Sequence, residues 1–386
     1  MKREANFSGR DGMKRLGSTL MKLGRFARLA LIASTLSLVA ASNSHAGCGT
    51  MHTLSPTTCG VVISVTGCYT FAPPVTLTAT SNAGDCIEIT APNVFLNIEG
   101  STITGTGTSS TGNGIHVAST AAGATILGNG DFSGFNIGIL AQARVRLEFP
   151  YVSGDNTDGI QLNGAASSKI VSGSSLSNGR NGVTVINSTG YAILNFNANG
   201  NAVSGIAVTT SNGGEITNST ASSNALAGIS LTTSNATNIS ASNASNNGSY
   251  GMELIDSNAN KILSSFADTN SIYGIYLKES ASNVLGQTES DNNPVAEVYL
   301  GCSDTSGPNG LACATPSKAN EIEDQLVLTG GGTEYGIAID TGNKANTVVG
   351  SSGFDDSIDD MYDANLVNQN TWFANSFSSA NQTYIH

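Results

Sequence analysis

Basic residues are scarce in this chain, and half of them fall before residue 47. The sequence holds 16 Lys and Arg against 28 Asp and Glu. Residues 1–46 contain 8 of the basic and 2 of the acidic residues, so the remainder carries 8 minus 26, or −18. A surface of that charge repels nucleic acid and anionic membranes. Nucleic acid is therefore excluded as a partner, and an acidic polysaccharide would need a local basic patch or a bridging cation.

Metal-ligating side chains are few as well. The chain has 4 His, and its 6 Cys form no Cys-x-x-Cys pair, so a soft-metal site is disfavoured. We expect no cofactor, with calcium as the one candidate. The acidic residues that could hold calcium fit no EF-hand spacing and are interpreted as a solvated acidic turn. They are Asp355, Asp356, Asp359, Asp360 and Asp363.

The chain lacks long apolar runs beyond its first 46 residues, so no membrane-spanning helix is expected. The run from Leu29 to Ala41 follows a basic stretch and precedes Ser44-His45-Ala46, which predicts a signal peptide over 1–46 and a secreted or periplasmic protein. All six cysteines lie after it, as suits an oxidising compartment. We expect a Cys302–Cys313 bridge and three possible pairings among the rest. These are Cys48, Cys59, Cys68 and Cys86.

A repeat of 23 residues is what the sequence has in abundance. The motif Gly-Ile/Val-x-Val/Leu/Ile recurs at that step, and columns of Ile, Asn and Ser keep the same register. Periods of this length indicate stacked repeats. The glycines are Gly159, Gly182, Gly205, Gly228, Gly251 and Gly274. The asparagines are Asn178, Asn201, Asn224, Asn247, Asn270 and Asn293.

Short alternating runs of Ile and Val between Asn, Gly and Ser turns predict several strands per repeat. A leucine-rich repeat would need Leu-x-x-Leu-x-Leu, which is missing. The pattern favours an all-β, single-stranded right-handed parallel β-helix of roughly eleven or twelve coils, stacked about 4.8 Å apart. We expect the asparagines to form a hydrogen-bonded ladder, and each glycine to supply a positive-φ bend.

These Gly-Ile-x-Val strands and Asn turns resemble the right-handed parallel β-helix superfold of pectate lyases, polygalacturonases, alginate epimerases and periplasmic NosD-like proteins. The resemblance covers residues 85 to 350, and residues 85–107 look like the first coil of secreted NosD-like chains. We expect a cysteine-containing N-terminal cap over 47–84, a disulfide-closed insertion at about 301–320, and a C-terminal cap over 351–386.

One tripeptide matches a catalytic element of the polygalacturonases. Asn156-Thr157-Asp158 corresponds to their Asn-Thr-Asp motif, but the Asp-Asp, Gly-His-Gly and Arg-Ile-Lys elements have no counterpart. We therefore interpret Asp158 as a polar turn residue. Arg180, one coil later, is expected to form a surface ion pair with it that contributes little to stability.

The candidate binding residues lie in the later repeats. Outward positions of successive strands hold Tyr276 and Tyr299, and the column before the glycine adds Tyr250 and Tyr273, so we expect an exposed aromatic platform for sugar rings. Neighbouring carboxyls could share a cation or perform acid and base catalysis. The candidate catalytic residues are Glu253, Asp256, Lys278 and Glu279.

Three functions remain open at this point. The first is a monomeric, non-catalytic extracellular protein that binds a polysaccharide or cell-surface glycan, or has a structural role. The second is a polysaccharide lyase or glycoside hydrolase acting on an acidic polysaccharide. The third, implied only by the resemblance, is a NosD-like accessory role in metal-site assembly.

Overall fold

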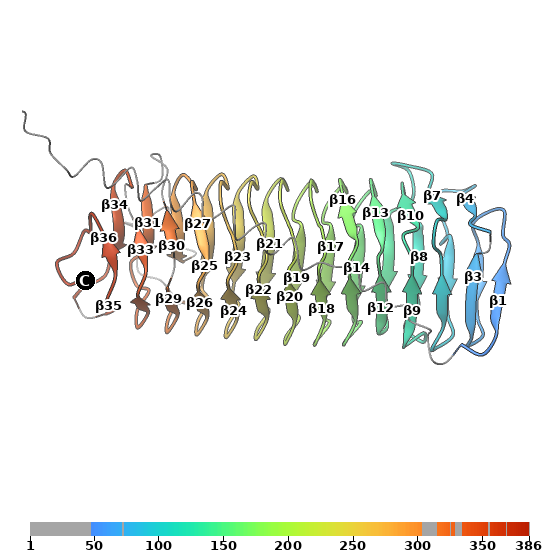
Figure 1. Cartoon of the computed structure of the whole chain (residues 1–386), viewed down its shortest axis with the longest axis horizontal. Coiled ribbons are helices and arrows are strands. Elements are labelled where there is room, and N and C mark those ends of the chain that lie inside the picture. Colours follow the sequence, from blue (N-terminus) through green and yellow to red (C-terminus); the bar gives the residue numbers. More distant parts are fainter. Residues whose placement is uncertain are drawn as a thin grey trace, which may run out of the picture. The chain divides into compact units, whose positions relative to one another are not determined.

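A computed structural model describes residues 48–71, 73–302, 315–324, 326–328, 334–353, 356–367 and 369–385. Contacts divide the chain into Met1–Cys48 and Gly49–His386, and the fold below is that of the second unit. Its described residues form β-strands and turns, and the strands pair in parallel (Figure 1). The predicted signal peptide lies outside the described residues.

The strands build three ribbons, here called sheets A, B and C. Sheet A holds, in spatial order, β1 (Met51–Leu54), β3 (Cys68–Phe71), β6 (Phe95–Asn97), β9 (Ala124–Leu127), β12 (Val145–Glu148), β15 (Lys169–Val171), β18 (Ala192–Leu194), β20 (Glu215–Thr217), β22 (Asn238–Ser240), β24 (Lys261–Leu263), β26 (Val284–Gly286), β29 (Glu321–Glu323), β32 (Thr347–Val349) and β35 (Thr371–Phe373).

Sheet B contains the Gly-Ile-x-Val strands. Its order is β2 (Val61–Ile63), β5 (Ile87–Ile89), β8 (Asn113–Val117), β11 (Ile137–Ala141), β14 (Ile160–Asn163), β17 (Val183–Ile186), β19 (Ile206–Thr209), β21 (Ala227–Thr232), β23 (Tyr250–Ile255), β25 (Tyr273–Lys278), β28 (Ala296–Gly301), β31 (Tyr335–Ile339) and β34 (Asp359–Asp363).

Sheet C is shorter and is interrupted in the middle of the stack. One part holds β4 (Thr76–Thr78), β7 (Thr102–Thr104), β10 (Asp131–Ser133), β13 (Tyr151–Ser153) and β16 (Ser174–Leu176). The other holds β27 (Glu289–Asp291), β30 (Leu326–Leu328), β33 (Ser352–Gly353) and β36 (Ser376–Phe377). The two parts are connected by a series of single-residue parallel bridges, one per coil, which begins at Ser174 and ends at Glu289.

Each coil runs through sheets B, A and C in turn, as β14, β15 and β16 do, and its neighbour repeats the path one strand further along. The predicted parallel β-helix and its 23-residue coil are confirmed. Sheet B has thirteen strands, against the eleven or twelve coils expected. The difference arises because β2 pairs with β5 and β34 with β31, so parallel pairing extends beyond 85–350 on both sides.

The interior is a continuous column of aliphatic side chains. Ile160 and Leu162 point inward with no exposed surface, whereas Gln161 between them is partly exposed. This alternation follows from the two-residue period of a strand, and stacking then places each Ile or Val on its equivalent one coil away. Each fully buried aliphatic side chain contributes about 1.5 to 3 kcal/mol, so the repeat itself generates the core.

The asparagine column forms the ladder that the register predicts. Asn178 donates from Nδ2 to Oδ1 of Asn201 at 2.9 Å and from its backbone N to the same oxygen at 3.0 Å. The same two bonds recur at each step from Asn201 to Asn293. All members are at most 2% exposed. A buried ladder satisfies backbone groups at the turn that strand pairing leaves unpaired.

The glycine column has a different role from the one expected. The repeat glycines do not adopt positive φ; the positive-φ positions are corner residues such as Ser172 and Asn195. At Gly182, an added Cβ would lie 2.8 Å from Nδ2 of Asn201 and 2.8 Å from the carbonyl oxygen of Gly205. Glycine is required there because the ladder amide and the next coil occupy the space of a side chain, which corrects the prediction of a bend.

Disulfides strengthen the N-terminal coils. Cys59 is bonded to Cys86, which selects one of the three pairings left open. Cys48, Cys68 and Cys302 are also disulfide-bonded. Cys313, the expected partner of Cys302, lies outside the described residues, as does most of the insertion. Beyond it the register resumes, because Leu285 pairs with Ile322 and Asn283 donates to Asn320 at 3.1 Å.

Candidate functional site

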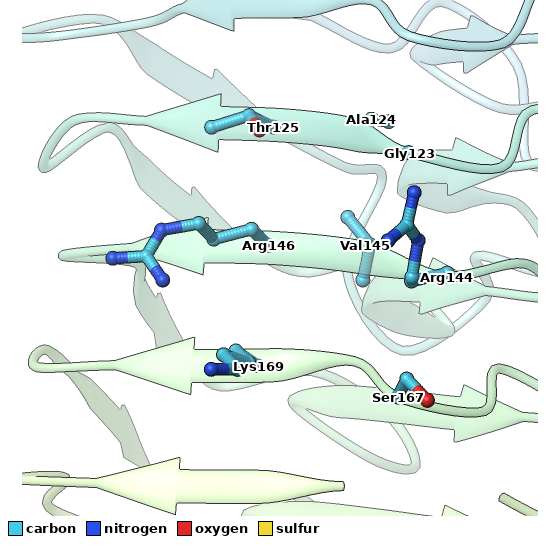
Figure 2. Close-up of a pocket in the computed structure, with 8 residues that line it drawn as sticks. All are labelled: Gly123, Ala124, Thr125, Arg144, Val145, Arg146, Ser167 and Lys169. Atoms are coloured by element: carbon cyan, nitrogen blue, oxygen red, sulfur yellow. The ribbon is translucent and has the colours of Figure 1, made fainter. Parts of the chain in front are cut away.

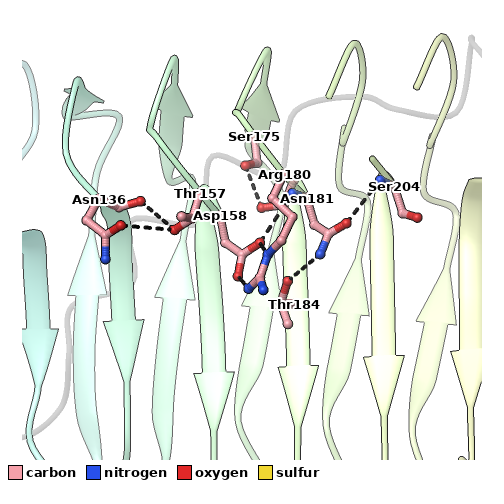
Figure 3. A network of polar contacts seen from close by, with 9 residues as sticks. Asn136, Thr157, Asp158, Ser175, Arg180, Asn181, Thr184 and Ser204 are labelled. Atoms are coloured by element: carbon pink, nitrogen blue, oxygen red, sulfur yellow. Dashed lines mark hydrogen bonds and ion pairs between the residues drawn. The ribbon is translucent and has the colours of Figure 1, made fainter. Parts of the chain in front are cut away.

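The Asn-Thr-Asp tripeptide is part of a structural network rather than an open site (Figure 3). Asp158 has no exposed surface. Arg180 donates from Nε to one of its carboxylate oxygens at 2.8 Å and from Nη2 to the other. The backbone N of Asn181 donates to the same carboxylate at 3.2 Å. Thr157 donates to the carbonyl oxygen of Asn136 at 2.7 Å.

The interpretation of Asp158 as a turn residue agrees with this network, and the predicted ion pair with Arg180 forms, but it is not the surface pair that we expected. The carboxylate is buried, and the hydrogen bond and charge of Asp158 raise the pKa of Arg180. The Arg180 side chain itself is 46% exposed. Removal of one partner from a buried pair leaves an uncompensated charge and costs several kcal/mol. Asp158 is therefore a stabilising residue, and both of its oxygens are already engaged.

The predicted tyrosines do gather on the outer face of sheet B. Tyr250, Tyr273 and Tyr299 stack in sequence, with ring centroids 5.7 Å and 4.6 Å apart and ring planes within 8° of parallel. Tyr276 packs beside them, with centroids 5.4 Å from Tyr250 and 5.0 Å from Tyr273. These four residues are called the tyrosine surface below. Strand register causes the arrangement, because β23, β25 and β28 lie side by side.

Tyr299 is not exposed as expected. Only 3% of its surface is accessible, and its hydroxyl donates to Oδ2 of Asp340 at 3.2 Å. Tyr273 is partly exposed, and burial, followed by the charges of Tyr250 and Asp340, raises its pKa to about 12. Both hydroxyls are therefore neutral at physiological pH. Tyr299 is the buried ring at the end of the stack, while Tyr250, Tyr273 and Tyr276 form the accessible part of the surface.

Sequence analysis missed two further tyrosines of this face. Tyr335 and Tyr362, on β31 and β34, have ring centroids 5.0 Å apart, and Tyr335 packs in one apolar cluster with Tyr299. Tyr335 stands before Gly336, in the same column as Tyr250 and Tyr273, so the repeat motif could have identified it. Tyr362 occupies the outward position equivalent to Tyr299, but irregular spacing in the last coils hides that register.

Glu253 lies at the edge of the tyrosine surface. It pairs in register with Tyr276, and Ser230 donates from Oγ to its Oε2 at 3.0 Å. Burial raises the pKa of Glu253, and the Ser230 hydrogen bond and the charge of Lys278 oppose that rise. Because one oxygen is bound by Ser230 and the side chain is partly exposed, Glu253 can accept a hydrogen bond from a ligand hydroxyl.

Asp256 and Glu279 lie one coil apart, just after β23 and β25. The pKa of Asp256 is raised by desolvation first, then by the charge of Glu279 and a hydrogen bond with it. Both residues have positive φ, as do Thr210 and Thr233 at the same corner of earlier coils. Their backbone conformation is thus a property of the coil corner and does not by itself indicate a functional site.

Acidic groups surround the tyrosine surface. The negative charge of Glu253 raises the pKa of Tyr250. The charges of Asp340 and Glu334 raise the pKa of Tyr273 in the same way. Lys278, the neighbouring cation, interacts with Glu253 and Asp256. The surrounding field therefore disfavours an anionic ligand here and is compatible with a neutral one.

Two of the acidic residues of the C-terminal region do not belong to the solvated turn that we expected. Asp360 and Asp363 are at most 1% exposed. Asp363 accepts hydrogen bonds from Nδ2 of Asn370 at 3.1 Å and Nε1 of Trp372 at 3.0 Å. Asp360 accepts one from the backbone N of Ser379 at 2.8 Å. Protein donors thus occupy these carboxylates, while Asp355 lies outside the described residues.

Known proteins and a protein-family model resemble this chain. A family model described as "Periplasmic copper-binding protein (NosD)" matches residues 141–309. No curated protein matches the chain. Among solved structures, the A-module of the mannuronan C-5 epimerase AlgE6 of Azotobacter vinelandii is 15% identical with a TM-score of 0.56, covering 87% of this chain and 91% of that one.

Two further solved structures are similar. The Dettilon tailspike protein is 14% identical with a TM-score of 0.55, covering 85% of this chain but only 61% of the tailspike chain. A double mutant of the periplasmic alginate epimerase AlgG is 12% identical with a TM-score of 0.51, covering 80% and 78%. The likeness to these three structures is one of fold, the parallel β-helix described above.

The described residues do not fit a copper site. They contain no group of three or more His, Cys, Asp or Glu that could hold a metal ion. Met252 and Met361 are fully buried, and the ring nitrogens of His116 are hydrogen-bonded to Asp85 at 2.8 Å and Gln142 at 3.0 Å. Within the same residues, no helix is long and apolar enough to cross a membrane.

Proposed function

We propose that the protein is a non-catalytic carbohydrate-binding protein of the periplasm or the extracellular space, and that it holds a neutral glycan against the tyrosine surface. The disulfides and the likeness to a periplasmic family support that location. The proposal rests mainly on one observation, that Tyr250 is the terminal ring of the tyrosine stack.

Tyr250 is the first ring of the stack, because Ala227 precedes it in the register. Tyr273 covers one face of the Tyr250 ring, and among the described residues no aromatic ring stacks on the other. A partly exposed aromatic face next to a hydrogen-bond acceptor suits a pyranose, whose axial C–H groups pack on the ring while its hydroxyls donate to the acceptor. Glu253 and Ser230, on β23 and β21, supply the polar partners.

Replacement of Tyr250 by Ala tests the proposal on a glycan array and then by titration with the best neutral ligand. We expect the loss of one stacked ring to weaken binding about tenfold, equivalent to roughly 1.4 kcal/mol. Tyr151→Ala is the matched control, because Tyr151 is 40% exposed on β13 of sheet C and lies outside the stack. Equal affinities of the two variants, with unchanged thermal stability, would contradict the proposed surface.

The interaction of Asp256 with Glu279 favours a second candidate, a polysaccharide lyase or hydrolase, since paired carboxyls perform acid and base catalysis in such enzymes. Incubation of neutral and uronic acid polymers with the protein and calcium separates the two functions. The non-catalytic proposal predicts no new unsaturated or reducing ends. Products that disappear in Asp256→Asn or Glu279→Gln would establish the enzyme instead.

A further inference from the structure

A second surface of different chemistry lies on sheet A. A groove of about 320 Å³ crosses β9, β12 and β15 (Figure 2). Its volume lies near the lower end of the range of small-ligand sites. The lining contains three basic and no acidic residues, in a chain whose predicted mature part carries −18. It consists of Gly123, Ala124, Thr125, Arg144, Val145, Arg146, Ser167 and Lys169.

The three cations are not equivalent. Arg146 donates from Nε to Glu148, which compensates its charge. Among the described residues, neither Arg144 nor Lys169 has an ion-pair partner, and both are exposed. Lys169 lies beside Arg146 in the register of β12 and β15, so cations of adjacent coils face one groove. The net charge of the groove comes from Arg144 and Lys169.

Gly123 leaves space for the Arg144 guanidinium. A Cβ at Gly123 would lie 3.3 Å from Nη2 of Arg144 and 2.5 Å from Oδ1 of Asn93. Gly123 has φ of +87°, a conformation in which other residues are strained. In Figure 2 the guanidinium extends from β12 toward Gly123. A side chain at this position of one coil would thus crowd the arginine of the next.

We propose that this groove binds an acidic glycan, with Arg144 as a forked donor to one carboxylate or sulfate and Lys169 as a separate cation for a second acidic group farther along the groove. A guanidinium binds such oxyanions through two parallel N–H groups. Ser167 and Thr125 supply hydroxyls for the neighbouring sugar oxygens. A short acidic oligosaccharide can keep its charges within the groove, whereas a nucleic acid carries a phosphate at every nucleotide and would meet repulsion from the anionic surface on both sides.

Titration with an oligogalacturonate, a sulfated oligosaccharide and a neutral oligosaccharide of equal length tests the proposal at low salt. We expect the acidic glycans to bind and the neutral one not to bind through the groove. Lys169→Glu and Arg144→Gln should each weaken acidic binding at least tenfold. Affinity should also fall as salt rises, because exposed charges are screened. The relative affinities of the two acidic probes identify carboxylate or sulfate as the natural group.

Lys261→Glu is the matched control, because Lys261 occupies the same outward column of sheet A four coils away and is also exposed. An equal loss in Lys261→Glu and Lys169→Glu would overturn the proposal, as would tighter binding of a single-stranded oligonucleotide or failure of both acidic probes to bind. Tyr250→Ala should leave acidic binding unchanged, so the groove and the tyrosine surface succeed or fail separately. Circular dichroism verifies the fold of each variant.

Discussion

The first coils of the polar ladder and its middle coils use the same positions in different ways. In the middle, Asn201 and its successors are neutral, and each donates to the next. At the start, Asp155 stands in the ladder column and Asp158 precedes the repeat glycine, so two buried carboxyls replace neutral groups within one coil. The backbone register tolerates both solutions. Their energetics differ, because buried charge needs a partner or a proton.

Arg180→Ala should produce the largest difference between the two regions. Without Arg180 the buried Asp158 carboxylate keeps only the backbone N–H of Asn181, so we expect the free energy of unfolding to fall by about 3 kcal/mol. Urea or thermal unfolding measures it. The double variant Arg180→Ala with Asp158→Asn should regain most of that loss, because no buried charge remains. If the double variant is as unstable as the single one, the loss reflects packing and not charge.

Asn224→Ala breaks the ladder in its regular part. The change removes the acceptor of the Asn201 side chain and of its backbone N–H, so we expect a loss of about 2 kcal/mol in the free energy of unfolding. Asn197→Ala, at an exposed position one turn earlier, serves as the control and should cost under about 0.5 kcal/mol. A loss as small as that of the control would mean that water replaces the ladder bonds.

Asp155→Asn should have the clearest pH signature of the three changes. Burial is the main cause that raises the pKa of Asp155 from 3.8 to about 8, so the folded protein favours the neutral acid. The unfolded chain releases the proton above about pH 4, so stability is present below that pH and is lost as the pH rises toward 8. An amide cannot ionise, and it can donate to Asn178 as the other ladder members donate.

We therefore expect Asp155→Asn to raise the free energy of unfolding at pH 7, with little gain at pH 4, because only the parent protein loses stability as the pH rises. The measurement is a series of unfolding curves between pH 4 and 9. The reciprocal change, Asn178→Asp, should lower stability and increase its dependence on alkaline pH. A stability difference between Asp155→Asn and the parent protein that stays constant with pH would show that Asp155 has an ordinary pKa.

The repeat made the fold predictable, because a strict register fixes which residues stack. The ladder from Asn178 and the inward Ile160 follow from spacing alone. The spacing of residues does not reveal which side chains of neighbouring coils pack against a given residue. Two predictions were wrong for this reason. The glycine at Gly182 serves to accommodate a ladder amide, and Tyr299 is covered although its outward position suggested exposure.

The tyrosine surface could be predicted from the sequence, but the groove could not, because spacing does not show which side chains surround a residue. The tyrosine surface was predictable because its members share two columns, whereas Asp340 enters it only through a hydrogen bond to Tyr299. The groove was overlooked although Arg146 and Lys169 are 23 residues apart, since isolated cations in a sequence carry no information about their neighbours' charges. Burial of Asp158 likewise depends on side chains that surround it from adjacent coils.

The regular pairing of sheet B also fixes the distance along the axis between the groove and the tyrosine surface. Four coil steps separate β14, which shares a coil with β15 of the groove, from β23, where the tyrosine surface begins. At the interstrand spacing this is about 19 Å along the axis. Since every step is one repeat, gain or loss of a whole repeat would change that separation by a single increment and leave both surfaces intact. Evolution of such a chain can thus adjust the distance between the two surfaces without redesigning either.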